Sequence, residues 1–451
     1  MKYLTTIQTF LVQKLPTSFF LNVSERRALG TVRRACKINP LFAKSVTKAS
    51  ISNIETFKNQ VPLSEKRAIF PSDLRELPIH SNNFDTVKTI LVSSGSSGHF
   101  SFGLKSEKEI NAVSKEADFA FESYFSGKSK KTMIINCLPM GSRVYCSIDC
   151  SDVGPHPARA RAAIAMAKRL GYEQVFVVSL GHIFVKELLE YDHSQYKFAW
   201  NNVFFFTGGE FFPESARSYF LEMLGDQDPK DQRPRIGNSG GVTELMLNSL
   251  FFESPDLIKI RQAMSQNPKL RELICGRETP YTPSLFMWNP LTSYLELIDG
   301  FITITNLDKH SLAPLVRYKL EDRGQFIEHD HLRQSLRKVG LERLFPKEKL
   351  PLLLFWGRSL TGKEHIIQEL IYRDRPAVKL LTGNFVLNGH ELSMQLKKGV
   401  KITSALDEAI SSFAESIRSN LGISVETRFK EFEVFDHNMS MNYENKFSYM
   451  R

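Results

Sequence analysis

Cysteine is scarce in this sequence, and its scarcity limits the kinds of site that the chain can build. There are five cysteines in 451 residues. Their number is odd and their spacing is unpaired, so we expect neither a disulfide framework nor a cysteine zinc site. Cys146 and Cys150 are spaced to share a helical face, but buried free thiols explain them better.

Long apolar runs are also missing. No window approaches the roughly 18 uninterrupted apolar residues that a membrane span requires. Gln8, Gln13 and Lys14 interrupt the apolar start of the chain, where a signal peptide would have its core. We therefore expect no membrane span and a cytoplasmic protein.

The composition is that of a large folded protein. Hydrophobic residues make up 42% and charged residues 24% of the chain, enough to bury a large core and to form a big body with a smaller appendage. The net charge of +10 would suit an anionic ligand such as a nucleotide, coenzyme A or an acidic carrier protein. A solvated basic surface explains the charge equally well, and we expect no nucleic acid partner.

The pattern of apolar residues predicts an α/β fold. A helical lead-in extends to about residue 85, after which short apolar runs alternate with amphipathic helices such as 107–125 and 158–170. This alternation is typical of a largely parallel sheet covered on both faces. We expect a body of mixed, largely parallel sheets over 1–357 and a small, mobile α+β lid domain over 358–451.

The first candidate site is a serine- and glycine-rich loop that follows the strand-like run KTILV. Glycines allow a tight turn with inward amide hydrogens, and serines add hydroxyl donors, so such a loop suits phosphate oxygens. It lacks the GK[ST] ending of a Walker loop, and an ordinary flexible loop is the competing interpretation. Its residues are Ser93, Ser94, Gly95, Ser96, Ser97 and Gly98.

Two further segments follow strand-like runs. The segment Thr207-Gly208-Gly209-Glu210 comes directly after VFFF, and a glycine pair at a strand end permits the close approach of a flat ligand. Thr243 and Glu244 offer a hydroxyl and a hard oxygen ligand. The competing interpretations are an ordinary strand-to-helix turn for the first segment and a helix start capped near Thr243 for the second.

The last three candidates carry charge. Asp322 ends the segment PLVRYKLED, Arg358 follows the apolar run LLLFW, and Lys446 lies in the segment NYENKF. A carboxylate has two acceptor oxygens for vicinal hydroxyls, and a cation can screen two anions that must approach each other. A surface ion pair of Arg317 with Asp322 and a solvated Lys446 are the competing interpretations.

In this order, the segments resemble the motifs of the adenylate-forming superfamily, which includes acyl-CoA synthetases, peptide-synthetase adenylation domains and firefly-type luciferases. The resemblance implies that the loop from Ser93 to Gly98 binds ATP phosphates and that Gly208 to Glu210 face the adenine. It further implies that Thr243 meets a phosphate and that Glu244 holds Mg²⁺.

The resemblance also assigns the charged candidates. Asp322 would bind the ribose, Arg358 would contact the nucleotide near a swivel between domains, and Lys446 would bridge the attacking carboxylate and the α-phosphate. The sequence departs from the family pattern at three places. Gly240 replaces an aromatic residue, Glu321 replaces a glycine, and Leu360 with Thr361 replaces acidic residues.

Within the superfamily, the sequence is most similar to the phenylacetate-CoA ligase-like branch, through NPLFAKSV and FKNQVPLSEKRAIFPSDL. That likeness implies that His156 and Phe211 line the acid pocket. A helix-capping histidine and a core phenylalanine are the alternatives.

The resemblance implies ATP-dependent activation of a small carboxylic acid, with an aromatic acid favoured. Thioester formation with CoA or with an acyl or peptidyl carrier protein would follow. No cysteine follows Cys275, which sets aside the acyl-protein synthetases that load a C-terminal cysteine. The alternative is a non-catalytic descendant that binds a nucleotide or an acid as a regulatory or assembly module.

Overall fold

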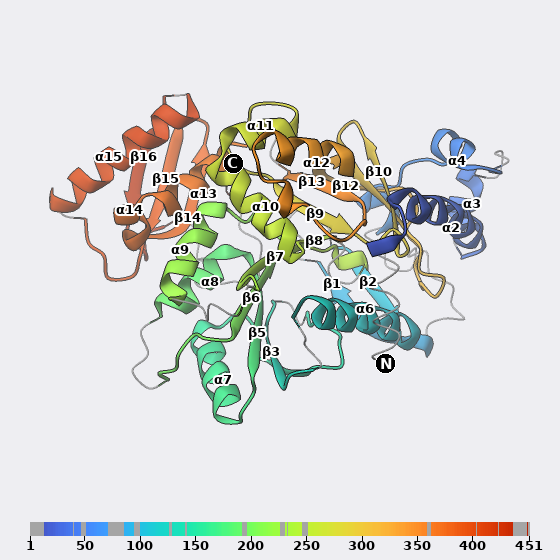
Figure 1. The fold of residues 1–451 in the computed structure, drawn as a ribbon, viewed down its shortest axis with the longest axis horizontal. Helices are drawn as coiled ribbons and strands as arrows, with labels where there is room; N and C mark the ends of the chain where they lie inside the picture. Colours follow the sequence, from blue (N-terminus) through green and yellow to red (C-terminus); the bar gives the residue numbers. More distant parts are fainter. Residues whose placement is uncertain are drawn as a thin grey trace.

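The computed structural model describes residues 13–38, 40–46, 51–70, 85–93, 100–125, 129–139, 142–191, 196–225, 231, 233–245, 251–358, 362–402, 404–422, 424–435 and 449. Figure 1 shows a large central body, a group of N-terminal helices at one end and a small C-terminal sheet with its helices at the other. Among the described helices, none is both long and apolar enough to cross a bilayer.

Four described helices precede the first described strand. They are α2 (Thr17–Ile38), α3 (Pro40–Val46), α4 (Ile54–Gln60) and α5 (Lys66–Ile69). Asn53 caps α4 through a reciprocal pair of hydrogen bonds with Thr56. The helices pack on the body through Ala28 and Val32 of α2, which share a buried cluster with Tyr294.

A two-stranded antiparallel hairpin then leads into the body. It consists of β1 (Val87–Val92) and β2 (Phe102–Ser106), and it is followed by the helix α6 (Glu107–Phe125). The bounds of α6 are those that the apolar spacing predicts.

One sheet of eleven strands forms the body, in the order β10-β11-β12-β13-β9-β8-β7-β6-β5-β3-β4. The part of the sheet from β7 to β4 pairs in parallel, and the connecting helices cover it, because a parallel strand must be reached by a crossover. These elements are β3 (Thr132–Cys137), β4 (Asp149–Asp152), α7 (Pro157–Arg169), β5 (Gln174–Leu180), α8 (Gly181–Glu190), β6 (Val203–Gly208), α9 (Glu214–Leu224) and β7 (Ile236–Gly240).

The other part of the same sheet, from β10 to β7, is antiparallel. Its strands are β8 (Phe251–Phe252), β9 (Ser284–Trp288), β10 (Ser293–Ile298), β11 (Phe301–Asn306), β12 (Tyr318–Ile327) and β13 (Leu352–Gly357). The helices that accompany it are η3 (Thr243–Leu245), α10 (Pro255–Gln266), α11 (Pro268–Cys275), α12 (His329–Lys338) and η4 (Glu342–Leu344). The predicted α/β class with mixed sheets is therefore confirmed.

The C-terminal part contains a separate three-stranded sheet in the order β14-β15-β16. Its elements are α13 (Lys363–Arg373), α14 (Arg375–Leu380), β14 (Leu381–Asn388), β15 (Glu391–Leu396), α15 (Ser404–Leu421) and β16 (Glu426–Lys430). The predicted small α+β unit is thus present.

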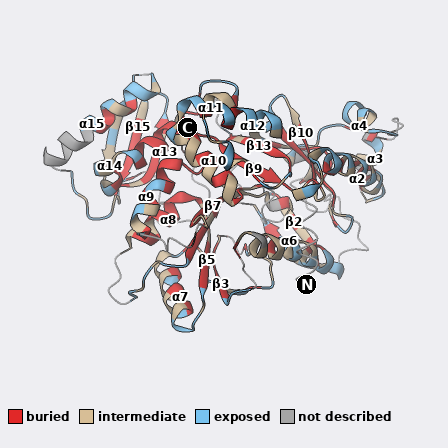
Figure 2. Ribbon diagram, viewed as in Figure 1, coloured by how far each residue is buried: buried red, intermediate tan, exposed pale blue. Residues whose placement is uncertain are grey.

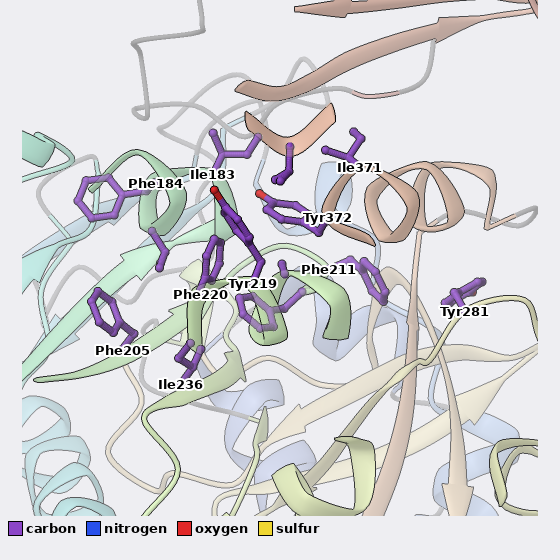
Figure 3. Packing of buried hydrophobic residues seen from close by; sticks show 14 of the residues in the cluster. Ile183, Phe184, Phe205, Phe211, Tyr219, Phe220, Ile236, Tyr281, Ile371 and Tyr372 are labelled. Carbon is purple, nitrogen blue, oxygen red and sulfur yellow. The ribbon is translucent and has the colours of Figure 1, made fainter. Parts of the chain in front are cut away.

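The main hydrophobic core is continuous from the body into this C-terminal part (Figure 2). Helix α13 packs against α9 of the body, and Figure 3 shows Tyr372 of α13 beside Tyr219 of α9. The centroids of these two rings are 6.1 Å apart. Body and C-terminal part therefore share one apolar interior in this arrangement.

Candidate functional site

The carboxyl ends of three neighbouring parallel strands meet at one edge of the sheet. Leu180 at the end of β5 pairs with Gly208 of β6, and Gly208 pairs with Ser239 of β7. Ligands of open α/β sheets bind outside such carboxyl ends. The segments after β5, β6 and β7 therefore form the frame of the candidate site.

Two glycines allow Glu210 to occupy this edge. Gly209 has a φ of +78° and Gly181 a φ of +65°, a region that other residues rarely adopt. A methyl group at Gly181 would lie 2.6 Å from Oε2 of Glu210, closer than real contacts permit. The sequence analysis singled out Gly209 and Glu210 but missed Gly181, although its place after the apolar run QVFVVSL was the same signal.

Gly208 is also confined. A methyl group there would lie 3.1 Å from both the carbonyl oxygen and the hydroxyl of Ser239. The small side chain thus lets β6 and β7 end close together. The absence of a side chain at Gly240 also has a steric reason. A methyl group at this position would lie 3.0 Å from Phe251. An aromatic side chain at position 240 has no room while Phe251 fills that space.

Glu244 lies in η3, just beyond the end of β7, and is 9% exposed. The hydroxyl of Tyr318 donates a hydrogen bond of 2.9 Å to its Oε1. Burial raises the pKa of Tyr318, as does the adjacent Glu244 carboxylate, so this hydroxyl remains a donor at neutral pH. The backbone of Thr243 lies in η3, whereas its side chain is outside the described part of the structure.

Asp322 and Arg358 lie together because β12 and β13 are antiparallel neighbours, with Arg323 paired to Gly357. Nε of Arg358 is 3.9 Å from Oδ1 of Asp322, and Nη1 of Arg358 is 3.0 Å from Oε2 of Glu321. Arg358 and Glu321 are more than half exposed, and Asp322 is 26% exposed. Glu321, the residue that departs from the family pattern, therefore makes the shorter ion pair with Arg358.

Ser93 stands at the base of the serine- and glycine-rich loop. Its hydroxyl accepts a hydrogen bond of 2.9 Å from the amide of Ser101, and its own amide donates one of 3.0 Å to the carbonyl of Ser101. The hairpin of β1 and β2 packs against η3, so the loop base is close to the element that carries Glu244. The remaining loop residues, Ser94 to Gly98, lie outside the described residues, as does Lys446.

Phe211 and His156 have different surroundings. Phe211 is 8% exposed, and its ring is stacked on His365 of α13 with a centroid distance of 3.9 Å. His365 in turn lies against Gly357, where a methyl group would be 3.2 Å from its ring. His156 is exposed at the position before α7 and makes no capping hydrogen bond with its side chain. Phe211 thus connects the end of β6 to the start of the C-terminal part.

A ring of buried charges supports this edge from behind. It consists of Glu214, Arg217, Glu253 and Arg261, whose side chains are at most 2% exposed. Each arginine lies within 3.0 Å of both glutamates. Burial by itself lowers the pKa of Arg217, but Glu214 and Glu253 raise it above its ordinary value. This buried charge ring is closed and electrically balanced.

The buried charge ring also holds the backbone of the site. Arg261 donates a hydrogen bond to the carbonyl of Phe212, two residues after Glu210. Glu253 accepts one of 3.0 Å from the amide of Asn238 in β7. The ring therefore fixes the segments after β6 and within β7 relative to each other. Sequence reasoning missed it because its members are up to 47 positions apart and read as solvated charges.

His182, which follows Gly181, is fully buried. Its Nδ1 is 3.1 Å from the hydroxyl of Tyr372, and within the described residues its Nε2 has no partner. Burial lowers the pKa of His182 to about 3, with a further contribution from the nearby Lys186. The imidazole is therefore neutral and joins the end of β5 to α13.

Solved structures provide the comparison for this geometry. No protein-family model matches the sequence, and no curated protein matches it. A 2-hydroxyisobutyryl-CoA ligase in its postadenylation state, bound to R3-HIB-AMP, is similar with a TM-score of 0.66 at 11% identity, over 98% of this chain and 91% of that chain. The chain has the fold of an adenylate-forming ligase.

Two other structures of that ligase are also similar to this chain. A postadenylation structure with 2-HIB-AMP has a TM-score of 0.60 at 12% identity, over 94% of this chain and 88% of that chain. The thioesterification state, with 2-HIB-AMP and CoA, has a TM-score of 0.53 at 12% identity, over 98% of this chain and 91% of that chain.

Proposed function

We propose that this protein uses Mg-ATP to convert a carboxylic acid into an acyl-adenylate and then transfers the acyl group to CoA. The observation that carries the proposal is the convergence of the predicted segments in a ligase fold. Glu210 follows β6 and Glu244 follows β7, while Tyr318 joins Glu244 to β12, the strand of Asp322. Structures of the similar ligase contain acyl-AMP and, in the thioesterification state, CoA.

In the first step, an oxygen of the acid attacks the α-phosphorus of ATP, and the bond from that phosphorus to the bridging oxygen breaks. Pyrophosphate leaves, and an acyl-AMP remains. The loop from Ser93 to Gly98 would bind phosphates, Asp322 the ribose and Gly208 to Glu210 the adenine. Such chemistry depends on positioning and electrostatics, so no side chain has to act as a nucleophile.

In the second step, the sulfur of CoA attacks the acyl carbonyl, the thiol loses its proton to solvent, and AMP leaves. The product is a thioester. We propose CoA as the acceptor in preference to a carrier-protein arm, because CoA is bound in the similar ligase.

Glu244 suits the role of a magnesium ligand. Within the described residues, no group of three or more His, Cys, Asp or Glu side chains could hold a metal by itself. Magnesium in nucleotide sites is held by one or two carboxylates, and phosphates and waters supply its other ligands. Among the described residues, Glu244 is hydrogen-bonded to Tyr318 through Oε1, and Oε2 would be the oxygen that binds the ion. Bound magnesium would neutralise phosphate charge.

The finer parts of the proposal concern specificity and the C-terminal part. We propose the phenylacetate-CoA ligase-like branch and an aromatic acid, with Phe211 and His156 at the acid pocket. We also propose that Thr243 meets a phosphate, that Arg358 contacts the nucleotide, and that 358–451 moves as a lid that brings Lys446 to the reacting oxygens. These assignments depend on the motif resemblance and need their own tests.

ATP-pyrophosphate exchange tests the function directly. The protein is incubated with Mg-ATP, labelled pyrophosphate and a panel of aromatic, fatty and hydroxy acids. We expect exchange with at least one acid. Glu244→Gln should reduce exchange at least tenfold, because it removes the charge that faces magnesium, whereas the exposed Glu272→Gln serves as a matched control that should leave it unchanged.

One observation favours a second candidate function. Arg358 is paired with Glu321, a residue that family members with glycine at this position do not offer. A nucleotide-binding module without turnover would tolerate that pairing. Such a module should show background exchange with every acid while Mg-ATP still raises the melting temperature. That combination of results would replace the enzyme with the binding module.

A further inference from the structure

Glu190 lies at the junction between the body and the C-terminal part, and its carboxylate contacts side chains from both. Its Oε1 accepts a hydrogen bond of 2.7 Å from the hydroxyl of Tyr219 in α9. Its Oε2 lies 2.8 Å from Nζ of Lys186 in the same helix, α8, and 2.8 Å from Nζ of Lys397, which follows β15. One carboxylate thus joins two helices of the body to the C-terminal sheet.

Lys186 makes a second contact across the junction. Its ammonium donates a hydrogen bond of 2.8 Å to the carbonyl of Leu381, the first residue of β14, and α8 packs against this strand (Figure 1). The side chain of Lys186 is 1% exposed, whereas those of Glu190 and Lys397 are 18% and 26% exposed. Burial lowers the pKa of Lys186, and the Glu190 carboxylate opposes this shift. The two contacts across the junction, through Lys186 and through Lys397, therefore depend on the charge of Glu190.

The helix itself does not explain a glutamate at position 190. Glu190 is the last residue of α8, where a negative side chain opposes the helix dipole. Lysine before glutamate is also the less favourable order for a pair four residues apart on a helix. Within the described residues, Glu190 is the carboxylate paired with both Lys186 and Lys397. The contacts across the junction therefore explain the place of this charge better than α8 does.

We propose that Glu190 is a positioning residue that holds the C-terminal part in its present place on the body and thereby sets the ratio of the two half-reactions. This inference rests on the proposed function, including the movement of residues 358–451. The similar ligase is known in a postadenylation state and in a thioesterification state. Where two steps use different placements of the C-terminal part, a contact that exists in one placement favours the step that this placement serves and slows the other.

The test measures the two half-reactions separately. ATP-pyrophosphate exchange reports adenylation, and transfer from supplied acyl-adenylate to CoA reports thioester formation. Glu190→Gln keeps the size of the side chain and removes its charge, so we expect the ratio of the two rates to change at least about fivefold. Lys397→Gln should change the ratio in the same direction. The double variant should match Glu190→Gln within about 1.5-fold, because both substitutions break the same contact.

Glu222→Gln is the matched control. Glu222 of α9 is paired with Arg375 of α14, so this ion pair also crosses the junction, but the two side chains are 59% and 38% exposed. An exposed pair contributes little, and we expect the ratio to stay within about 1.5-fold.

Three results would overturn the positioning role. One is an unchanged ratio in Glu190→Gln. Another is an equal fall of both rates together with a lower melting temperature, which is the result of a merely structural role. The third is a double variant in which the effects of Glu190→Gln and Lys397→Gln multiply, because the two side chains would then act independently.

A second measurement does not require activity. An amine-reactive ester labels Nζ of Lys186 when the junction opens, so the labelling rate, followed by mass spectrometry, reports the open population. Lys397→Gln should raise this rate at least about threefold over Glu222→Gln. Besides burial, Lys397 itself lowers the pKa of Lys186, so its removal would make the amine less reactive. Faster labelling of Lys186 in this variant therefore comes from opening of the junction.

The two measurements distinguish failure of the positioning role from failure of the proposed function. Equal labelling rates of Lys186 in Lys397→Gln and Glu222→Gln would overturn the positioning role even in an active enzyme. Absence of exchange with every acid, together with faster labelling in Lys397→Gln, would remove the proposed function and the positioning role with it. The ion pair would then only hold the two parts of the chain together.

Discussion

The buried charge ring allows a sharp prediction about stability. Glu253→Gln removes one negative charge and leaves the two arginines, Arg217 and Arg261, facing a single carboxylate in a water-free interior. Removing one partner of a buried ion pair typically costs about 3–5 kcal/mol, because the other charge stays buried without compensation. The amide of Asn238 also loses a charged acceptor. We therefore expect unfolding free energy to fall by about 3–5 kcal/mol.

The matched control is Glu272→Gln. Glu272 pairs with Lys269 at 3.0 Å, the same separation as within the ring, but the two side chains are 46% and 65% exposed. An exposed pair contributes about 0–1 kcal/mol. Urea unfolding followed by circular dichroism should separate the two variants clearly. If their unfolding free energies agree within about 1 kcal/mol, burial does not govern the ring's contribution and the reasoning is refuted.

Three further predictions concern single residues. His182 has a pKa of about 3 when folded, against 6.5 when unfolded, so stability should fall as pH decreases from about 6.5 towards 3, by about 1.4 kcal/mol per pH unit. His182→Gln should lack this part of the slope in urea titrations, and an unchanged slope would contradict the assignment. Gly181→Ala should lower the melting temperature more than Gly276→Ala. The two glycines have similar φ values of +65° and +69°, but only a methyl group at position 181 would collide with Glu210. Equal changes in melting temperature would contradict this steric explanation. Glu321→Ala should lower the KM for ATP by up to about fivefold, since an exposed ion pair that competes for Arg358 is worth at most about 1 kcal/mol. An unchanged KM in initial-rate assays would show that Arg358 does not bind the nucleotide.

The sequence predicts well where local pattern decides the structure. Helix α6 has the bounds that its apolar spacing indicates, and α7 begins at Pro157, one residue before the predicted start. The glycine pair after β6 is likewise visible, because a buried strand followed by Gly208 and Gly209 has few explanations. Both features can be predicted because apolar periodicity and backbone freedom depend only on residues that are close together in the sequence.

The rest depends on contacts between distant residues. The pairing of β13 between β12 and β9 joins residues from 284 to 357, and no local signal specifies this order. Gly240 looked like a defect in the family pattern until the structure placed Phe251 in the space of the missing side chain. A surface ion pair with Asp322 was the competing interpretation for Arg317, which is instead buried and paired with Glu296 at 3.1 Å.

The shared core between body and C-terminal part restricts how a swivel could work. Ile367, Leu370, Ile371 and Tyr372 of α13 are at most 7% exposed, and the helix packs on α9. Each large apolar side chain that a rotation uncovered would cost about 1.5–3 kcal/mol. The same helix also packs on α14, β14 and α15, so its apolar side chains lie between the body and the rest of the C-terminal part. A swivel of residues 358–451, as proposed above, would therefore have to exchange the contacts of α13 with α9 for others of similar apolar area, which limits the rotation to positions that keep this helix covered.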